Sequence, residues 1–201
     1  MPAQRFWNLP EEKRKRLMDS AWDEFDRAPF EELSINKIIQ SASISRGSFY
    51  TYFEDKQDLL NYMLADFFRF VHQSMLKSLE RSGGDLFVLA IDLFDFAVRY
   101  GGRHRRKQAA ENIITYARQS GMWIEQRTTK CEGQLEEIAL KLNADLLKAG
   151  SLEDLKRMLE MVFMITIGSL KDVVFEIRPA GLVRTELLRK LELVKQGFAA
   201  R

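Results

Sequence analysis

Residues 34–60 read SINKIIQSASISRGSFYTYFEDKQDLL, and two short amphipathic helices fit this stretch. Ser34 can cap the first helix, while the second helix starts at Ser45 and closes by Phe53. Two short helices joined by a brief turn and preceded by a longer helix are the components of a helix-turn-helix. The stretch therefore predicts a unit of this kind.

The second short helix separates into an inner face and an outer surface. Phe49 and Phe53 are four residues apart, so they share one face, which we expect to point inward. The other rows carry Arg46, Gly47 and several hydroxyl groups. Arginine can fork to guanine or phosphate, hydroxyls bond phosphate oxygens, and glycine lets a backbone approach closely. Residue types alone leave DNA binding and simple packing both open.

We expect the rest of the chain to be helical as well. None of the four prolines lies between residues 30 and 178, and apolar residues recur at helical spacing rather than alternating. A first helix follows Pro10, and the cap-like pair Asp55 and Asp58 opens a long one. Further helices are expected at 85–100, 103–119, 122–149, 152–177 and 181–199.

Composition indicates a folded, soluble protein. Apolar residues make up 46% of the 201 residues and charged residues 30%. The net charge of +2 does not by itself announce a nucleic-acid-binding protein. The single cysteine, Cys131, cannot form an internal disulfide, and we expect it to be a buried core thiol. Since neither a signal sequence nor an apolar run of about 18 residues is seen, we expect a cytoplasmic protein without a membrane span.

Catalysis is not expected. The sequence holds two histidines and one cysteine, without metal-ligand spacing, a glycine-rich phosphate loop or a nucleophile motif. No cofactor and no metal site are predicted.

Residues 34–60 closely resemble the DNA-binding signature of the TetR family of bacterial transcriptional regulators. That signature is roughly T-x-x-x-I-A-x-x-A-G-V-S-x-G-x-x-Y-x-[YH]-F-x-x-K-x-x-L. The resemblance implies an all-α fold, with a three-helix helix-turn-helix DNA-binding domain over residues 1–56 and a larger helical effector-binding and dimerisation domain over residues 57–201. Two positions depart from the signature, because Ser43 replaces a glycine of the turn and Ile39 replaces an alanine.

The resemblance also implies the residues that contact DNA. Ser34 and Lys56 match phosphate-contacting positions, and Tyr50 with Tyr52 matches an aromatic pair that contacts the backbone. The start of the second short helix would read the base sequence. The complete set is Ser34, Asn36, Ser45, Arg46, Gly47, Ser48, Tyr50, Thr51, Tyr52 and Lys56.

For the larger part, the family implies a small effector bound between helices and a homodimer formed through the last two helices. Aromatic and methionine side chains line adaptable apolar cavities, so we expect a largely apolar effector, although each such residue also fits an ordinary core. The candidates are Phe67, Phe70, Phe94, Tyr116, Trp123, Met158, Met161 and Phe163. The basic run at 103–107 could attract an anionic effector or an acidic partner, or be a solvated helix start.

The sequence thus predicts a repressor that binds a palindromic DNA operator as a homodimer and is released by a small-molecule effector. The two half-sites would lie about one DNA turn, ~34 Å, apart. Two alternatives stay open. One is a transcriptional activator, and the other is a TetR-like helical adaptor whose main role is to bind another protein.

Overall fold

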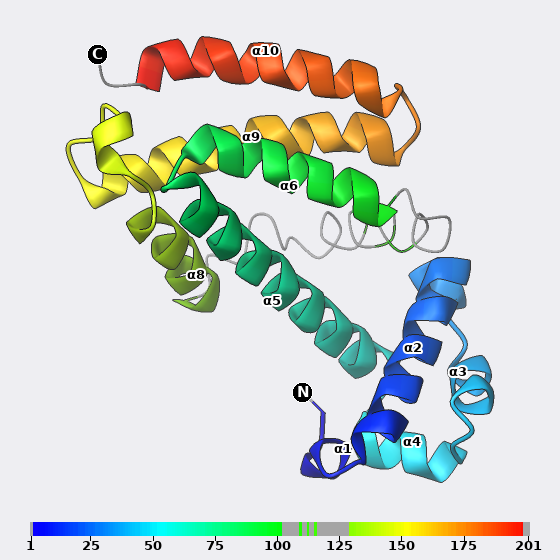
Figure 1. Cartoon of the computed structure of the whole chain (residues 1–201). Helices are drawn as coiled ribbons and strands as arrows, with labels where there is room; N and C mark the ends of the chain where they lie inside the picture. Colours follow the sequence, from blue (N-terminus) through cyan, green and yellow to red (C-terminus); the bar gives the residue numbers. More distant parts are fainter. Residues whose placement is uncertain (1, 102–108, 110–111, 113–114, 116–128, 199–201) are drawn as a thin grey trace. The chain divides into compact units, whose positions relative to one another are not determined.

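The structure, a computed structural model, describes residues 2–101, 109, 112, 115 and 129–198. Over these residues it consists of helices and their connections, with no strand (Figure 1). The predicted all-α class is confirmed. The predicted helix at 103–119 lies mostly outside the described residues, as does the side chain of Cys131.

The chain divides into two compact units. The first holds residues 2–70 together with 109, 112 and 115, and the second holds residues 71–101 and 129–198. This division falls within helix α5, Lys56–Ser82, which begins in the first unit and ends in the second. The boundary expected after residue 56 stays a prediction.

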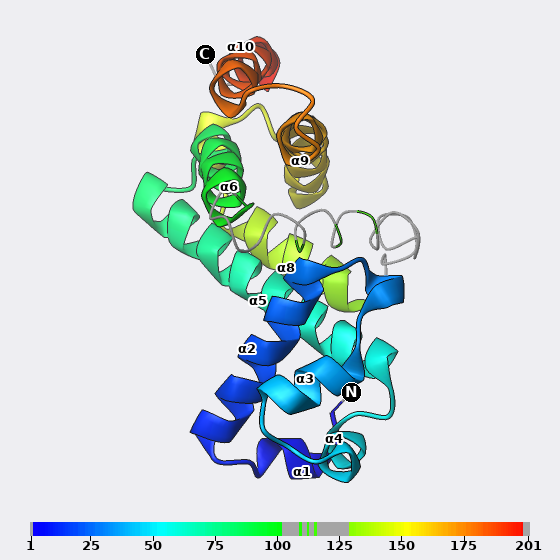
Figure 2. The same ribbon diagram turned by 90° about the vertical axis from the view of Figure 1, so that its right-hand side faces the viewer.

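The first unit contains the expected helix-turn-helix (Figure 2). Its elements before α5 are α1 (Gln4–Trp7), α2 (Glu11–Arg27), the 3-10 helix η1 (Phe30–Glu32), α3 (Ile35–Ser41) and α4 (Arg46–Tyr52). Helix α2 follows Pro10 and buries Leu17, Ala21 and Phe25 at a spacing of four residues, which places them on one face. Helix α3 packs against both α2 and α4.

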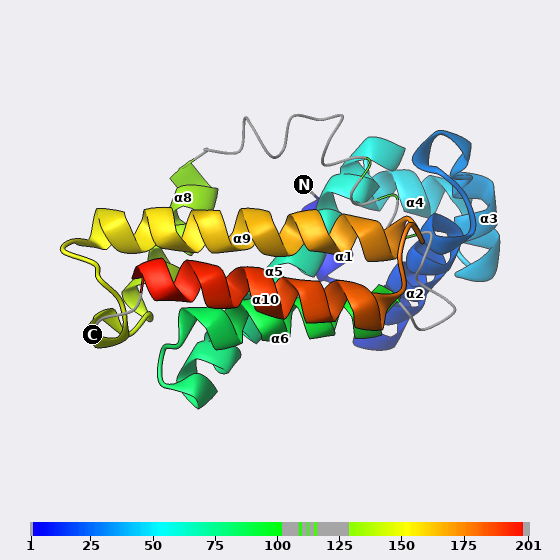
Figure 3. The same cartoon turned by 90° about the horizontal axis from the view of Figure 1, so that it is seen from above.

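The second unit is a helical bundle. Beyond the end of α5 it comprises α6 (Leu86–Gly101), α8 (Thr129–Leu140), the 3-10 helix η2 (Ala144–Leu146), α9 (Leu152–Val174) and α10 (Ala180–Phe198). Helices α9 and α10 run side by side in opposite directions, and α6 packs against both (Figure 3). The core between these helices is formed by buried leucines together with Phe94, Val162 and Val183.

Helix α8 corrects one sequence-based expectation. A single helix over 122–149 was predicted, but α8 ends at Leu140 and a 3-10 turn follows at Ala144–Leu146. The side chain of Asn143 accepts from the backbone N–H of Asp145 at 3.0 Å, which favours a turn over a helix. The backbone N–H of Asn143 also donates to the carbonyl of Gly84 at 2.9 Å. This distant contact fixes where the chain leaves the helix.

Two glycines end α5 in the left-handed region, with φ of +67° at Gly83 and +83° at Gly84. A Cβ on Gly83 would meet nothing within 4 Å, whereas one on Gly84 would lie 2.6 Å from the backbone nitrogen of Asn143. Glycine is therefore favoured at position 83 by the backbone conformation alone. At position 84 it is favoured both by the conformation and by the close approach of the backbone around Asn143.

Comparing Gly83→Ala with Gly84→Ala separates these two causes. We expect Gly83→Ala to cost about 1 kcal/mol of unfolding free energy, the usual cost of left-handed backbone. Gly84→Ala should cost clearly more, since backbone atoms cannot move aside without breaking the Asn143 contact. Urea unfolding of the two purified variants measures the difference. Equal losses would contradict the close approach.

Candidate nucleic-acid interface

The two short helices begin at the serines that the sequence indicated. The Ser34 hydroxyl accepts from the backbone N–H of Lys37 at 3.4 Å, and the Ser45 hydroxyl accepts from that of Ser48 at 3.0 Å. The Ser45 and Ser48 hydroxyls lie 2.8 Å apart. Each cap satisfies a backbone donor that the helix itself leaves unpaired. The predicted starts of both helices are therefore confirmed.

The turn between α3 and α4 adopts the left-handed backbone that the signature requires. Ser43, which replaces the signature glycine, has φ of +55°. The N–H of Ser43 donates to Gln40 and that of Ile44 to Ile39, so the turn closes with the hydrogen bonds of a Schellman motif. A serine here costs about 1 kcal/mol relative to glycine, but the geometry of the turn is kept.

A buried carboxylate connects α2 to the start of α3. Two oxygens of Glu24 accept from Arg27, at 2.7 and 2.6 Å, and one of them also accepts from the backbone N–H of Ser34 at 3.1 Å. The Glu24 side chain is 6% exposed. The hydrogen bonds from Arg27 act against the cost of burial and, with the bond from Ser34, hold the pKa of Glu24 below its ordinary value.

Three predicted DNA-contacting residues meet on the surface. Nη1 of Arg46 donates to Oδ1 of Asn36 at 2.8 Å, and Nη2 donates to the Tyr50 hydroxyl at 3.4 Å. The guanidinium carbon of Arg46 also lies 5.6 Å from the centroid of the Tyr50 ring. All three residues are exposed, so the structure brings them together as one polar group, which we call the Arg46 triad.

Gly47 lies next to the Arg46 triad on an open surface. An added Cβ would find its nearest neighbour, the Ser45 hydroxyl, at 3.9 Å, which is ordinary contact. Packing within the chain therefore does not require glycine at this position. The small residue leaves the start of α4 accessible to a ligand as bulky as DNA.

Other residues predicted to contact DNA also form interactions within the protein. The Thr51 hydroxyl donates to the carbonyl of Ser48 at 2.7 Å. The half-buried ring of Tyr52 packs edge-on against Phe6 at 6.4 Å, and its carbonyl accepts from the N–H of Ala3 at 2.9 Å. For these residues a DNA contact stays a prediction.

Lys56 bridges the start of α5 to η1. Its ammonium donates to the carbonyls of Phe30 at 3.2 Å and Glu31 at 3.0 Å, and lies 4.9 Å from the centroid of the Phe30 ring. The group is thus engaged with the protein in this structure, whereas the signature assigns it to a phosphate. Ammonium has three donors, so both uses are compatible.

Sequence reasoning missed the role of the first residues. Phe6, in α1, is fully buried, and its ring lies 5.1 Å from the rings of Phe53 and Tyr62. Helix α1 therefore packs the end of α4 from outside the signature. An aromatic pair, Phe6 and Trp7, directly before Pro10 was the available signal.

A second missed contact joins distant parts of the first unit. The buried amide of Asn112 donates to the carbonyls of Phe25 at 2.7 Å and Ala28 at 2.9 Å. The N–H of Ala109 donates to Asp26 at 3.0 Å. The two bonds from Asn112 satisfy the carbonyl of Phe25 at the end of α2 and that of Ala28 directly after it. Local sequence patterns carry no signal for pairs so far apart.

The effector candidates fall into different environments. Phe94 is fully buried in the core of the second unit, and Met158 and Phe163 pack against that core. Phe70 and Met161 are exposed, Phe67 is half-buried against Trp22, and Tyr116 and Trp123 lie outside the described residues. None of the described candidates lines the pocket of about 320 Å³ in the second unit. Their role as effector contacts stays a prediction.

Two other classes of site were searched over the same residues. No group of three or more His, Cys, Asp or Glu side chains in the described ranges is arranged to hold a metal ion. In those ranges, too, no helix is long and apolar enough to cross a bilayer.

Comparisons with known proteins agree with this geometry. The family described as bacterial regulatory proteins, tetR family, matches residues 17–63. An uncharacterized HTH-type transcriptional regulator of Bacillus subtilis (strain 168), YdgC, is 34% identical over 56 residues, which cover 28% of this chain and 29% of that protein. The chain therefore matches less than a third of that relative's length.

Two solved structures share the fold over most of their length. The putative transcriptional regulator SCO4942 from Streptomyces coelicolor is 18% identical, with a TM-score of 0.59 over 92% of this chain and 98% of that one. A putative TetR-family regulator from Vibrio parahaemolyticus is 16% identical, with a TM-score of 0.56 over 94% of this chain and all of that one. At these identities the likeness concerns the fold.

Stability of the first unit should depend on pH through Glu24. Because the pKa of Glu24 is lowered in the fold, its stabilisation is complete above the unfolded pKa of about 4.3 and is lost as the pH falls through the lower, folded pKa. Glu24→Gln should therefore lose about 1.5–3 kcal/mol at pH 7, the worth of a hydrogen bond to a charged group. The deficit should shrink toward zero in acid.

Urea unfolding from pH 7 to pH 3 measures this loss. The matched control is Asp19→Asn, an exposed carboxylate on the same helix, which should stay within about 0.5 kcal/mol of wild type at pH 7. If Glu24→Gln lowers the free energy of unfolding by the same amount at all pH values, the contribution of Glu24 does not depend on its charge.

Proposed function

We propose that this chain, which belongs to the TetR family of bacterial regulatory proteins, is a ligand-responsive repressor that binds a palindromic DNA operator as a homodimer and is released by a small-molecule effector. The observation that carries the proposal is the exposed Arg46 triad at the capped start of α4. Helix α4 would enter the major groove with this end first.

The chemistry of the triad supports base and phosphate contact. Arg46 is held by neutral oxygen atoms of Asn36 and Tyr50, and no carboxylate of the described residues pairs with it. Its positive charge is therefore available to guanine O6 and N7 or to a phosphate. Asn36, which orients the guanidinium, also has the amide geometry that reads adenine. A DNA phosphate would replace these bonds to neutral oxygens with bonds between two ionised groups.

The second unit supports dimerisation through α9 and α10. Apolar side chains on both helices face solvent, with Met164 at 74% exposed and Leu193 at 69%. In α9, Met161, Met164 and Gly168 follow helical spacing on the side opposite the buried Leu159 and Val162. Gly168 has open space around it, so a second helix could approach closely. Such a surface is suited to a second copy of the chain.

DNA binding is tested by combining Arg46→Ala with Tyr50→Ala. The duplex is first selected by the wild-type protein from a random-sequence pool and then used in gel shifts at fixed salt. We expect the double variant to lose about 1–3 kcal/mol, or about five- to 150-fold, in affinity for that duplex. Arg157→Ala, an exposed arginine on α9, is the charge-matched control and should bind as wild type does. Unchanged binding by the double variant would show that α4 is not the recognition helix.

The dimer is tested by Met164→Glu. Burying an unpaired carboxylate at a helix interface is strongly unfavourable, so we expect the dimer to weaken at least tenfold, about 1.4 kcal/mol. The control, Leu140→Glu, changes an exposed apolar residue on α8, 64% exposed against 74% for Met164, and should leave association unchanged. Sedimentation at micromolar concentration reports both. A monomeric wild-type protein would refute the proposed assembly.

A further inference from the structure

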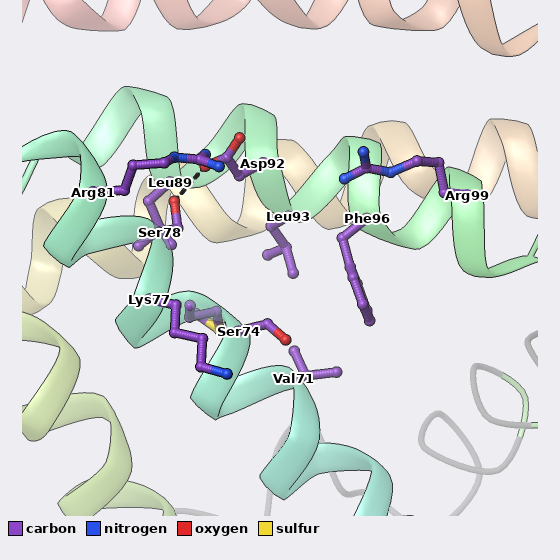
Figure 4. A pocket seen from close by; sticks show the side chains of 11 residues that line it. Val71, Ser74, Lys77, Ser78, Arg81, Leu89, Asp92, Leu93, Phe96 and Arg99 are labelled. Carbon is purple, nitrogen blue, oxygen red and sulfur yellow. Dashed lines mark hydrogen bonds and ion pairs between the residues drawn. The ribbon is translucent and has the colours of Figure 1, made fainter.

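A pocket of about 320 Å³ lies between α5 and α6 within the second unit (Figure 4). Its volume is at the lower end of the range of small-molecule sites, roughly 300–1,000 Å³. Met75 and Leu89 form part of the buried core and Val71 packs against it, whereas the other lining residues do not belong to that core. The pocket therefore lies on the outer side of this helix pair.

The floor of the pocket is apolar. Leu93 and Phe96 project from α6 toward α5, and Val71 lies across from them on α5 (Figure 4). All three side chains are half-buried, so part of their apolar surface remains in contact with solvent. Covering it with a ligand's hydrocarbon part would be favourable at about 25 cal/mol per Å².

The rim of the pocket carries an excess of positive charge. Lys77, Arg81 and Arg99 contribute three cations, against the single carboxylate of Asp92. Asp92 is already engaged, since it accepts from the Ser78 hydroxyl and from Arg81. Arg99 donates to the backbone carbonyl of Asp95 at 3.2 Å. Neither Arg99 nor Lys77 forms an ion pair with a described residue. Within the described part of the chain, these two cations beside an apolar floor have no carboxylate partner.

We propose that this pocket binds a small amphipathic anion, a carboxylate carrying an apolar chain or ring. The positive charges of Lys77 and Arg99 would attract the carboxylate, and the apolar part would cover Leu93 and Phe96. An uncharged molecule of the same shape would bind more weakly, and a cation would be repelled. That the bound anion is the effector rests on the proposed function, whereas its binding to the pocket does not.

The test uses decanoate as the probe and the full purified chain. Isothermal titration at fixed salt compares decanoate with decanol, which is uncharged, and with decyltrimethylammonium, which is cationic. We expect decanoate to bind at least tenfold more tightly than either, about 1.4 kcal/mol. Lys77→Glu and Arg99→Glu should each weaken decanoate at least tenfold. Lys141→Glu makes the same charge change at an exposed residue outside the pocket and should stay within about twofold of wild type.

Three outcomes would overturn the proposal. Failure of decanoate to bind, equal affinity for decanol, or equal weakening by all three charge reversals would show that the pocket is not an anion site. Thermal melts of each variant confirm that it is folded. Gel shifts on the selected duplex separate the two proposals: decanoate binding without specific DNA binding refutes the repressor, and DNA binding without decanoate binding refutes the pocket.

Discussion

The arrangement of the helix-turn-helix depends on the buried carboxylate of Glu24. Its two oxygens fix Arg27 at the end of α2 and the backbone N–H of Ser34, the capping residue of α3. That connection joins the end of α2 to the start of α3, and α3 carries Asn36, which holds the guanidinium of Arg46. A buried charge is costly unless fully bonded. The three hydrogen bonds to Glu24 satisfy this carboxylate at the base of the helix that carries Asn36.

Several side chains of the signature stabilise the fold as well as being suited to DNA. Lys56 holds the carbonyls of Phe30 and Glu31, and Tyr52 packs against Phe6. A phosphate near Lys56 would therefore compete with, or add to, contacts that shape the DNA-binding unit itself. Removing the Lys56 side chain would lower both the affinity for DNA and the stability of the contacts with η1. The Arg46 triad is exposed, so substitutions there report on DNA recognition more directly.

Local interactions were predictable from the sequence, and distant ones were not. The starts of α3 and α4 follow from Ser34 and Ser45, since a cap involves a hydroxyl and an N–H three residues away. The left-handed turn at Ser43 is local in the same sense. By contrast, the chain after α8 is held by a backbone hydrogen bond from Asn143 to Gly84, and no local sequence pattern predicts this bond. Helical spacing of apolar residues alone therefore predicted a helix that continued past Leu140.

The same distinction applies to ligand binding. Aromatic and methionine residues were predicted to line an effector pocket, but such residues also fill protein cores, and Phe94 is buried in the core of the second unit. The proposed anion site combines open volume with the cations Lys77 and Arg99, and the residues that line it come together only in the folded chain. Helix α5, Lys56–Ser82, belongs to both units, since Lys56 at its start holds η1 and Lys77 further along lines the pocket.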